Sequence, residues 1–375
     1  MSEYSLLDVV NVTTGKLNSN AATINGAYPF FTCSPETLSI DTYSFDTEAL
    51  LLAGNNAEGN FSLKYYFGKF DAYQRTYILT MSEERLTTYK YLFYLLKTRL
   101  LELKNNSAGS ATKFLTLSIL KDIRFTLPRL SEQQAIASVL SALDDKIDLL
   151  QRQNQTLEQM AATLFRQWFI EEAKEDWEEV TIGDIFTLKG GSTPSTKESS
   201  FWDGNISWTS PRDLSNSKSI FMFDTERKIT EAGLAKISSG LLPKRTLLMS
   251  SRAPIGYLAI TDIEVAINQG YIAIPEHQTY STEFMYLWCQ LNMDTIENAG
   301  NGSVFQEISK SSFKDLIFFV PDENTLAKFD AFVKPTFAKI KSNTQQIQTL
   351  KSQRDTLLPK LISGEVRLKG FETVS

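Results

Sequence analysis

Two long stretches of the chain place their apolar residues at alternating steps of four and three, the heptad spacing of helices that pack side by side. Ser131 and Gln134 form a capping-box pattern that opens the first stretch just after Pro128. Its seam consists of Ile136, Leu140, Leu143, Ile147, Leu150, Asn154, Leu157, Ala161, Leu164 and Trp168. The second, weaker seam consists of Phe329, Val333, Thr336, Ile340, Asn343, Ile347, Leu350, Arg354, Leu357 and Leu361. The pattern predicts two long helices.

One asparagine interrupts each seam and suggests how the helices pair. An antiparallel register pairs Leu140 with Leu357, Ile147 with Leu350, Leu157 with Ile340, and Asn154 with Asn343. Two buried amides in one layer can satisfy each other and fix the register. In the alternative interpretation, each asparagine faces solvent or a water molecule. Pro335 is expected to kink or restart the second helix near its first turn.

A strand-like stretch precedes each helix and occurs twice. K-D-I-R-F-T-L-P at 121–128 matches K-D-L-I-F-F-V-P at 314–321, at a separation of 193 residues. Fainter echoes link 7–10 with 183–186 and 73–77 with 267–271. Solenoid repeats run roughly 20–50 residues, so this period indicates a duplicated domain-plus-helix unit. We expect each stretch to be the last strand of a domain, ended by its proline.

The repeat divides the chain into a domain at 1–130, a helix at 131–175, a domain at 176–321 and a helix at 322–375. The predicted fold class is α+β: two mixed α/β domains separated by two long antiparallel coiled-coil helices, in a pseudo-twofold repeat. In the second domain we expect strands at 206–210, 246–250 and 270–274, an amphipathic helix at 282–293 and a loop at 298–303. In the first domain we expect a helix at 85–104 and a loop at 105–110.

Composition narrows the class of protein. The chain has 375 residues, of which 42% are hydrophobic and 22% charged, as in ordinary globular proteins. We find no apolar run long enough to span a bilayer, no signal-peptide pattern, and only Cys33 and Cys289, so we expect a cytoplasmic protein. The net charge of −6 argues mildly against a nucleic-acid partner, so any such binding must depend on local surfaces.

The motifs of catalysis are missing from the sequence. His277 is the one histidine, so a catalytic triad has at most one candidate for its base. No Cys/His spacing suits zinc. The segment that begins at Lys189, K-G-G-S-T, lacks the spacing of a Walker A loop. We therefore predict no catalytic residue, no metal and no cofactor in this chain.

The loops are rich in amides and in side chains that suit DNA. Asn and Gln can pair with adenine and Arg with guanine in the major groove, while Ser, Thr, Lys and Tyr commonly contact phosphates. For any single residue, ordinary loop composition is the competing explanation. The candidate DNA-binding residues are Asn55, Asn56, Lys64, Tyr65, Lys69, Gln74, Arg75, Trp208, Arg212, Lys244, Ser250, Ser251, Arg252, Asn268 and Gln269.

Four segments carry a resemblance to a known family. Residues 353–367 look like its C-terminal conserved segment, and 127–136 look like the entry to its central conserved region. Residues 245–256 and 267–271 look like the core of a target recognition domain. Over its whole length the chain resembles the specificity (S) subunits of Type I restriction–modification systems. The first domain departs from the pattern, because 53–59 stand where 251–256 would have a counterpart.

The resemblance implies a function in DNA recognition without chemistry. Each domain would read one half of a split target in double-stranded DNA, and the helices would set the gap between the halves. The helices would also dock two modification (methyltransferase) subunits, which use S-adenosylmethionine for DNA methylation. Restriction subunits would then cleave unmodified DNA with ATP and Mg. The alternative is an assembly scaffold, in which a coiled coil joins two protein-binding domains that do not bind DNA.

Overall fold

The computed structural model describes residues 3–56, 59–83, 85–106, 114–215, 217, 219–252, 254–302 and 306–370, the side chains of 105 and 106 excepted. These residues form two compact units. Unit 1 comprises the described parts of 1–147 and 349–375, and unit 2 comprises those of 148–348. Each long helix therefore contributes one part to unit 1 and another part to unit 2.

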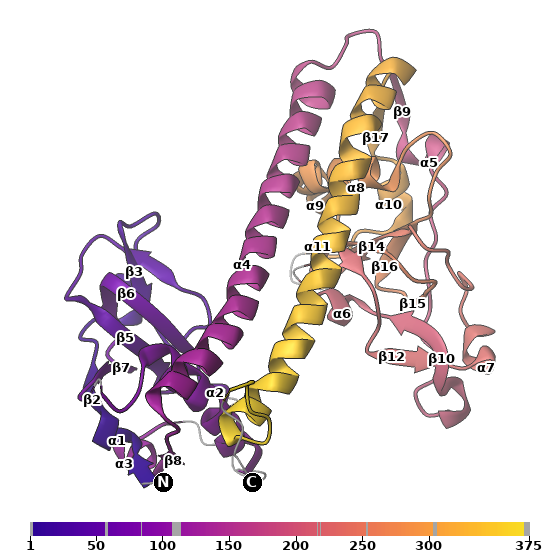
Figure 1. The fold of residues 1–375 in the computed structure, drawn as a ribbon. Helices are drawn as coiled ribbons and strands as arrows, with labels where there is room; N and C mark the ends of the chain where they lie inside the picture. The colour runs from indigo at the N-terminus through magenta and orange to yellow at the C-terminus, as the bar shows by residue number, and fades with distance from the viewer. Residues whose placement is uncertain are drawn as a thin grey trace. The chain divides into compact units, whose positions relative to one another are not determined.

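Unit 1 is built on a six-stranded sheet that packs against the helix α2 (Tyr89–Asn106) (Figure 1). In sheet order the strands are β2 (Val10–Thr14), β7 (Thr76–Met81), β5 (Phe45–Ala53), β6 (Leu63–Ala72), β3 (Tyr28–Phe31) and β4 (Leu38–Ile40). A short η1 helix (Ser19–Ala21) follows β2. The helix α2 begins four residues later than the expected 85, because Thr88 Oγ1 accepts a hydrogen bond from Tyr91 N at 3.2 Å and caps it.

The strand β5 explains why unit 1 has a core on each face of its sheet. Successive side chains of a strand point to opposite faces, and in β5 both sets are apolar. Leu50 and Leu52 join the core that includes α2, whereas Ala49 and Leu51 join the core on the other face, with Phe70. All five are almost fully buried.

Unit 2 contains two sheets of more than two strands. In order, one contains β11 (Phe221–Met222), β14 (Ile255–Thr261), β13 (Leu247–Ser251) and β16 (Tyr271–Ile274). The other contains β12 (Arg227–Ile229), β10 (Trp202–Thr209) and β15 (Ala266–Ile267). The strands expected at 206–210, 246–250 and 270–274 are confirmed as parts of β10, β13 and β16. The short helices η3 (Ser199–Phe201), α6 (Pro211–Ser215) and α7 (Glu231–Leu234) connect these strands.

The helix expected at 282–293 differs in length and in character. It is divided into α8 (Thr282–Leu291) and α9 (Met293–Asn298). Asn292 ends α8, where its Nδ2 donates a hydrogen bond to Trp288 O at 2.8 Å. Every residue from Thr282 to Cys289 is buried, so α8 is an enclosed core helix and the prediction of an amphipathic one was wrong. Of the two expected loops, 107–110 and Ser303 lie outside the described residues.

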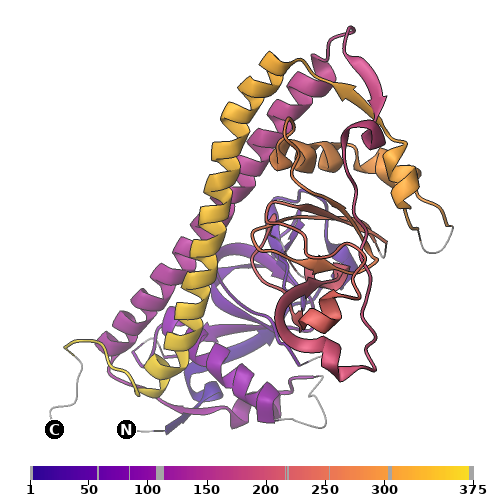
Figure 2. The same ribbon diagram turned by 90° about the vertical axis from the view of Figure 1, so that its right-hand side faces the viewer.

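Each unit contains a two-stranded antiparallel ribbon. In unit 1, β1 (Glu3–Ser5) pairs with β8 (Arg124–Thr126), and in unit 2, β9 (Glu178–Thr181) pairs with β17 (Ile317–Val320). The strands β8 and β17 lie in the two matching K-D-x-x-F-x-x-P stretches, which confirms them as last strands. Figure 2 shows the chain passing from the end of α4 into β9 and returning from β17 into α11.

The first strand of each ribbon leads into a one-turn helix with the same cap. The helix α1 (Leu6–Val9) has a capping box of Ser5 and Asp8, and α5 (Ile182–Ile185) has one of Thr181 and Asp184. The last strand of each ribbon follows a short helix, either α3 (Leu117–Asp122) or α10 (Lys310–Lys314). The faint echo between 7–10 and 183–186 is therefore a structural repeat.

The helices α4 (Leu130–Arg166) and α11 (Glu323–Ser363) run side by side in opposite directions (Figures 1 and 2). In unit 2, Asn343 Nδ2 donates a hydrogen bond to Asn154 Oδ1 at 2.9 Å, so the two amides meet in the layer that the register predicts. Asn154 Nδ2 donates to Thr344 Oγ1 at 3.2 Å. Asn343 Oδ1 is buried and has no partner among the described residues, so the two amides satisfy each other in one direction only.

In unit 1, the polar member of the weaker seam is held by an ion pair. Arg354 Nη1 lies 2.7 Å from Asp144 Oδ1, and Asp144 Oδ2 accepts a hydrogen bond from Tyr94 Oη at 2.8 Å. Leu140 and Leu361 are almost fully buried in the same core, and Leu357 packs against it. The guanidinium thus reaches past the seam to an acidic residue that the heptad pattern does not place there.

The heptad pattern fails near the end of α4 and at Pro335. Phe165 and Phe169 are buried, whereas the expected Leu164 and Trp168 are only partly buried. Phe165 lies in the last turn of α4, and Phe169 lies in the π-helical turn η2 (Gln167–Glu171) that follows. Pro335 lies inside α11 and does not restart it. Because its neighbours Val333 and Phe337 are fully buried, packing holds the helix across the missing N–H group. Among the described residues, no helix has the length and apolar character needed to cross a bilayer.

Candidate DNA interface

Three candidate residues of unit 2 line one shallow depression of about 380 Å³: Arg212, Arg252 and Asn268. They come from α6, from the end of β13 and from the turn before β16. Backbone hydrogen bonds bring these three segments together, from Asn268 N to Thr209 O at 3.0 Å and from Ser251 N to Gly270 O at 2.8 Å. The fold therefore gathers two guanidinium groups and one amide at one edge of unit 2.

The two arginines of this depression differ in their partners. The side chain of Arg212 is exposed and makes no hydrogen bond or ion pair within the described part of the chain, although its backbone carbonyl accepts from Ser215 Oγ at 2.8 Å. Arg252 Nη1 lies 3.3 Å from each carboxylate oxygen of Glu307, and these side chains are 40% and 48% exposed. Both guanidinium groups are thus accessible to an anion or to the edge of a base, and that of Arg252 lies beside the carboxylate of Glu307.

Gln74 and Gln269 occupy equivalent places in the two units. Gln74 Nε2 donates to Asn18 Oδ1 at 3.1 Å, and Gln269 Oε1 accepts from Thr193 Oγ1 at 2.7 Å. The glutamine of unit 1 thus bonds to the loop that follows β2, and the glutamine of unit 2 bonds to the loop that follows α5. Arg75 is exposed beside Gln74, as Asn268 is half-exposed beside Gln269.

A close backbone approach fixes these loops in both units. A Cβ atom on Gly15 would lie 1.9 Å from Ala72 O, and one on Gly191 would lie 1.8 Å from Ile267 O. Such distances are too short for any side chain, so glycine is required at both places. The glycines at 190–191 therefore serve loop packing, which agrees with the absence of a Walker A spacing.

Three candidates of unit 2 are buried, and we remove them from the interface. Trp208 is 5% exposed and lies edge-on against Trp202, which the guanidinium of Arg227 covers at 3.4 Å. Ser250 is fully buried: its Oγ donates to Pro254 O and accepts from Tyr257 N, each at 2.8 Å. Ser251 is 4% exposed. Polar residues at the end of a buried strand satisfy neighbouring backbone groups here, and they cannot reach DNA.

Three candidates of unit 1 are occupied in internal contacts. Lys64 Nζ donates to Ser34 O at 3.1 Å and to Glu36 O at 2.8 Å, and burial lowers the pKa of Lys64. Tyr65 Oη donates to Glu48 at 2.8 Å, and burial followed by this bond raises the pKa of Tyr65 to about 12. The third is Asn56, whose Oδ1 accepts from Asn60 N at 2.9 Å.

Two further candidates, Lys69 and Lys244, are exposed lysines. Lys69 is exposed and its Nζ lies 4.6 Å from the centre of the Tyr43 ring, and the contact with Tyr43 raises the pKa of Lys69. Lys244 is exposed before β13, at the opposite end of that strand from Arg252. The structure therefore does not bring Lys244 to the depression.

Sequence reasoning missed the residues that face the candidates across these loops. Glu307 pairs with Arg252, and in unit 1 the exposed Phe114 forms a backbone bridge with Asn55. Phe114 and Glu307 are separated by 193 residues, so the repeat could have identified them as equivalent. No local motif marks either residue.

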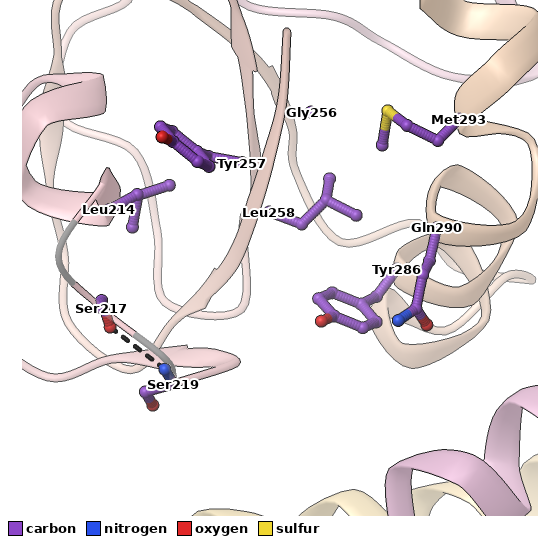
Figure 3. A pocket seen from close by; sticks show the side chains of 9 residues that line it. All are labelled: Leu214, Ser217, Ser219, Gly256, Tyr257, Leu258, Tyr286, Gln290 and Met293. Atoms are coloured by element: carbon purple, nitrogen blue, oxygen red, sulfur yellow. Dashed lines mark hydrogen bonds between the residues drawn. The ribbon is translucent and has the colours of Figure 1, made fainter. Parts of the chain in front are cut away.

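A second hollow of unit 2 contains none of the candidates. It has a volume of about 270 Å³ and lies between β14 and α8. Figure 3 shows Tyr286 and Gln290 facing Leu258 across it, with Met293 near Gly256. A Cβ atom on Gly256, whose φ is +101°, would lie 2.7 Å from Met293 Sδ, so this glycine serves both a left-handed turn and close packing.

The described residues include no cluster of His, Cys, Asp and Glu that could hold a metal ion. Arg245, in the motif at 245–256, is occupied by acids: its Nη2 lies 2.9 Å from Glu283 and its Nε lies 2.6 Å from Glu276. Burial opposes the charge of Arg245, but these carboxylates raise its pKa above the ordinary value. Arg245 therefore forms ion pairs within unit 2, whereas the exposed polar side chains of this unit can offer hydrogen bonds and charge to a ligand.

The family model described as Type I restriction modification DNA specificity domain matches residues 1–159 and 174–352. This chain belongs to that family. The MjaIX specificity subunit of Methanocaldococcus jannaschii is 29% identical over 305 residues, which are 75% of this chain and 69% of that protein. The EcoDI specificity subunit of Escherichia coli is 42% identical over 136 residues, but this match spans only 36% of the chain and 29% of the relative.

A solved structure supports the same fold. The S subunit of a Type I restriction–modification system from M. genitalium matches with a TM-score of 0.63 and 20% identity, over 96% of each chain. The predicted family, the α+β fold class and the role of a non-catalytic DNA specificity subunit are thereby confirmed. The family match favours this role over that of a scaffold without DNA binding.

Proposed function

We propose that unit 1 and unit 2 each read one half of a bipartite target in double-stranded DNA. The observation that carries the proposal is the repeated frame: the same capped helix, ribbon and glycine-packed loop present a different set of exposed polar side chains in each unit. Two related but different surfaces suit a target whose halves differ in sequence. For this purpose we retain Asn55, Gln74 and Arg75 of unit 1, and Arg212, Arg252, Asn268 and Gln269 of unit 2.

The paired helices would set the spacing between the two half-sites. In this proposal 1–130 and 176–321 are the target recognition domains, and 131–175 and 322–375 are the spacer helices. The amide layer of Asn154 and Asn343 supports the assignment, because a polar layer fixes the register, and hence the length, of a helical pair. Each unit contains one ribbon and part of each long helix, so the chain offers two equivalent surfaces. Two such surfaces suit two modification subunits.

The partners would supply the chemistry. Modification subunits would bring S-adenosylmethionine and methylate the target, and restriction subunits would bring ATP and Mg, in the cytoplasm where the DNA lies. Because this chain has a net charge of −6, we expect basic surface on the modification subunits to contribute much of the attraction to phosphate. The chain would add sequence preference to that attraction.

Filter binding of the assembled complex with its modification subunits tests the proposal. The duplexes would carry the methylated sequence found by sequencing the methylome of a host that expresses the system, or the same sequence with one half scrambled. We expect salt-dependent binding that needs both halves. Equal binding to intact and scrambled duplexes at every salt concentration would support a scaffold instead.

Insertion of one heptad into both helices tests the spacer. Seven residues placed beside Asn154 and beside Asn343 add roughly 10.5 Å of helix, which equals about three base pairs of DNA at 3.4 Å each. The methylated sequence of the variant should therefore contain a spacer about three base pairs longer, with both half-sites unchanged. An unchanged spacer in an active complex would refute the role of the helices as a ruler.

A further inference from the structure

Within each unit, three backbone segments are hydrogen-bonded to one another. This meeting point, called the crossing below, is equivalent in the two units. In unit 1, Leu115 N donates to Gly54 O at 2.9 Å and Gly54 N donates to Arg75 O at 2.8 Å. In unit 2, Ile308 N donates to Ser251 O at 3.0 Å and Ser251 N donates to Gly270 O at 2.8 Å. The residues next to these bonds form an antiparallel bridge in each unit, and these bridges are Asn55 with Phe114 and Arg252 with Glu307. Asn55 is therefore the structural counterpart of Arg252, although the sequences around them differ.

The side chains at this crossing differ in kind between the units. In unit 2 a guanidinium lies beside a carboxylate, with Arg252 Nη1 3.3 Å from both oxygens of Glu307. In unit 1 the residue opposite Asn55 in the bridge is the aromatic Phe114, which is 56% exposed. Asn55 Oδ1 is buried without a hydrogen-bond partner in the described part of the chain, so the amide has an unmet acceptor.

Each pair of side chains matches both bases of one kind of base pair. In the major groove, arginine donates two hydrogen bonds to guanine O6 and N7, and glutamate accepts one from cytosine N4. Asparagine pairs with adenine, since its oxygen accepts from N6 and its nitrogen donates to N7, while phenylalanine packs against the thymine methyl group. The exposed, ion-paired Arg252 and Glu307 contribute little to stability, so folding does not explain them.

On the basis of the proposed function, we infer that this crossing is a specificity switch between the two units. Arg252 and Glu307 read a G·C pair in the half-site of unit 2. Asn55 and Phe114 read an A·T pair in the half-site of unit 1, after the Asn55 side chain turns its oxygen toward adenine. The ion pair of the free protein opens on binding, because both partners exchange each other for the two bases.

Exchange of the pairs tests this inference in the assembled complex with its modification subunits. Unit 2 would carry Arg252→Asn with Glu307→Phe, and a second complex would carry Asn55→Arg with Phe114→Glu in unit 1. Methylome sequencing of a host that expresses the first variant is expected to show one G·C pair replaced by A·T in the half-site of unit 2. The second variant is expected to show one A·T pair replaced by G·C in the half-site of unit 1. The half-site of the unchanged unit should stay as in the wild type.

A milder variant keeps the test decisive if an exchanged complex fails to assemble. Glu307→Met keeps an unbranched exposed side chain of similar length and removes the carboxylate oxygens that would accept from cytosine N4. Discrimination at one base pair should fall by about 5- to 150-fold, the factor that corresponds to one specific contact. Lys244→Gln is the matched control, because Lys244 is exposed at the other end of β13, and it should leave discrimination unchanged at every position.

The outcomes separate this inference from the proposed function. If the wild-type complex binds specifically and Glu307→Met keeps its discrimination at every base pair, the switch is refuted while the proposed function stands. If Arg252→Asn weakens binding equally on all sequences, Arg252 contacts a phosphate and the switch is again refuted. If the wild-type complex shows no sequence preference, the proposed function itself fails, and the switch fails with it.

Discussion

Units 1 and 2 share a frame, which consists of the capped one-turn helix, the ribbon and the glycine-packed loop. They differ in their sheets and in their exposed side chains. Both contain a strand followed by a capped one-turn helix, and in both a glycine packs against a backbone carbonyl, Gly15 against Ala72 O and Gly191 against Ile267 O. Leu6 N donates to Ile123 O at 3.0 Å, and the counterpart Ile182 N donates to Leu316 O at 2.9 Å. Between these fixed points, unit 1 has one six-stranded sheet, whereas unit 2 has sheets of four and three strands with an enclosed helix.

The difference shows where the sequence is free to change. Backbone contacts and caps recur because they depend on geometry, and few residue types satisfy them. Sheet size and exposed side chains vary because loops on a rigid frame tolerate substitution. A protein that must recognise two unlike half-sites would need this combination of a conserved frame and divergent loops.

The largest expected effect comes from the glycines of the frame. Gly191→Ala should lower the free energy of unfolding by about 3 kcal/mol or more, because its Cβ would lie 1.8 Å from Ile267 O. Gly15→Ala should do the same in unit 1, where the distance to Ala72 O is 1.9 Å. All five tryptophans lie in 148–348, so tryptophan fluorescence in denaturant follows unit 2, and far-UV circular dichroism follows both units.

The neighbouring glycine supplies a matched control for this comparison. A Cβ atom on Gly190 would meet nothing within 4 Å, so Gly190→Ala should change the free energy of unfolding by less than about 0.5 kcal/mol. Equal stabilities of Gly190→Ala and Gly191→Ala would contradict the close approach of Gly191 to Ile267 O. A loss of stability in Gly191→Ala without one in Gly15→Ala would contradict the structural equivalence of the two loops.

The second prediction concerns the amide layer that links the helices in unit 2. Asn343→Leu removes the donor to Asn154 Oδ1 and leaves that buried acceptor unsatisfied, which should cost about 1–3 kcal/mol. The double variant with Asn154→Leu removes both amides and should recover most of the loss. A double-mutant cycle followed by tryptophan fluorescence measures the coupling. Additive losses would mean that the two amides act independently.

The sequence predicts the elements of the fold better than the surface of the site. The heptad seams, the strands β10, β13 and β16 and the matching strands β8 and β17 follow from local periodicity, which a buried face imposes directly. Phe169 departs from that pattern inside a π-helical turn, where the spacing of buried residues changes. Such a turn has no signature in the spacing of apolar residues.

The candidate site could be predicted only in part, because polar loop residues have two uses. Ser250 and Lys64 satisfy backbone carbonyls, whereas Arg212 and Arg75 face solvent, and composition alone does not separate these uses. The partner of Arg252 lies 55 residues away in the chain. Long-range bridges decide which side chains meet, and they appear only once the strands are placed.

The third prediction separates support of a loop from DNA binding in unit 1. Lys64→Met removes the donor to Ser34 O and Glu36 O, and it should destabilise unit 1 by about 1 kcal/mol without changing sequence preference. Lys69→Met, on the same strand but exposed, should cost less than about 0.5 kcal/mol. Far-UV circular dichroism and filter binding measure the two effects. Weaker DNA binding at unchanged stability would restore Lys64 as a contact.

The smallest expected effect compares one helix position in the two units. Glu158 of unit 2 is half-buried, and its counterpart 193 residues later is the exposed Lys351 of unit 1. Burial raises the pKa of Glu158 in the folded state, so the folded protein holds this proton more tightly than the unfolded chain does. The contribution to stability is therefore fully present below the unfolded-state pKa and is lost as pH rises through the folded-state pKa.

Glu158→Gln removes that dependence and should stabilise unit 2 at neutral pH. Because the wild-type carboxyl is already protonated in acid, the gain in thermal midpoint should shrink as the pH falls toward the range where free glutamate is protonated. Tryptophan fluorescence during heating, recorded for both proteins across this range, gives the difference. Lys351→Gln is the control, because Lys351 is exposed at the equivalent position, and its difference should not vary over the same pH range. A gain for Glu158→Gln that grows toward low pH would show that the charged form is the favoured one, and that some partner outweighs burial.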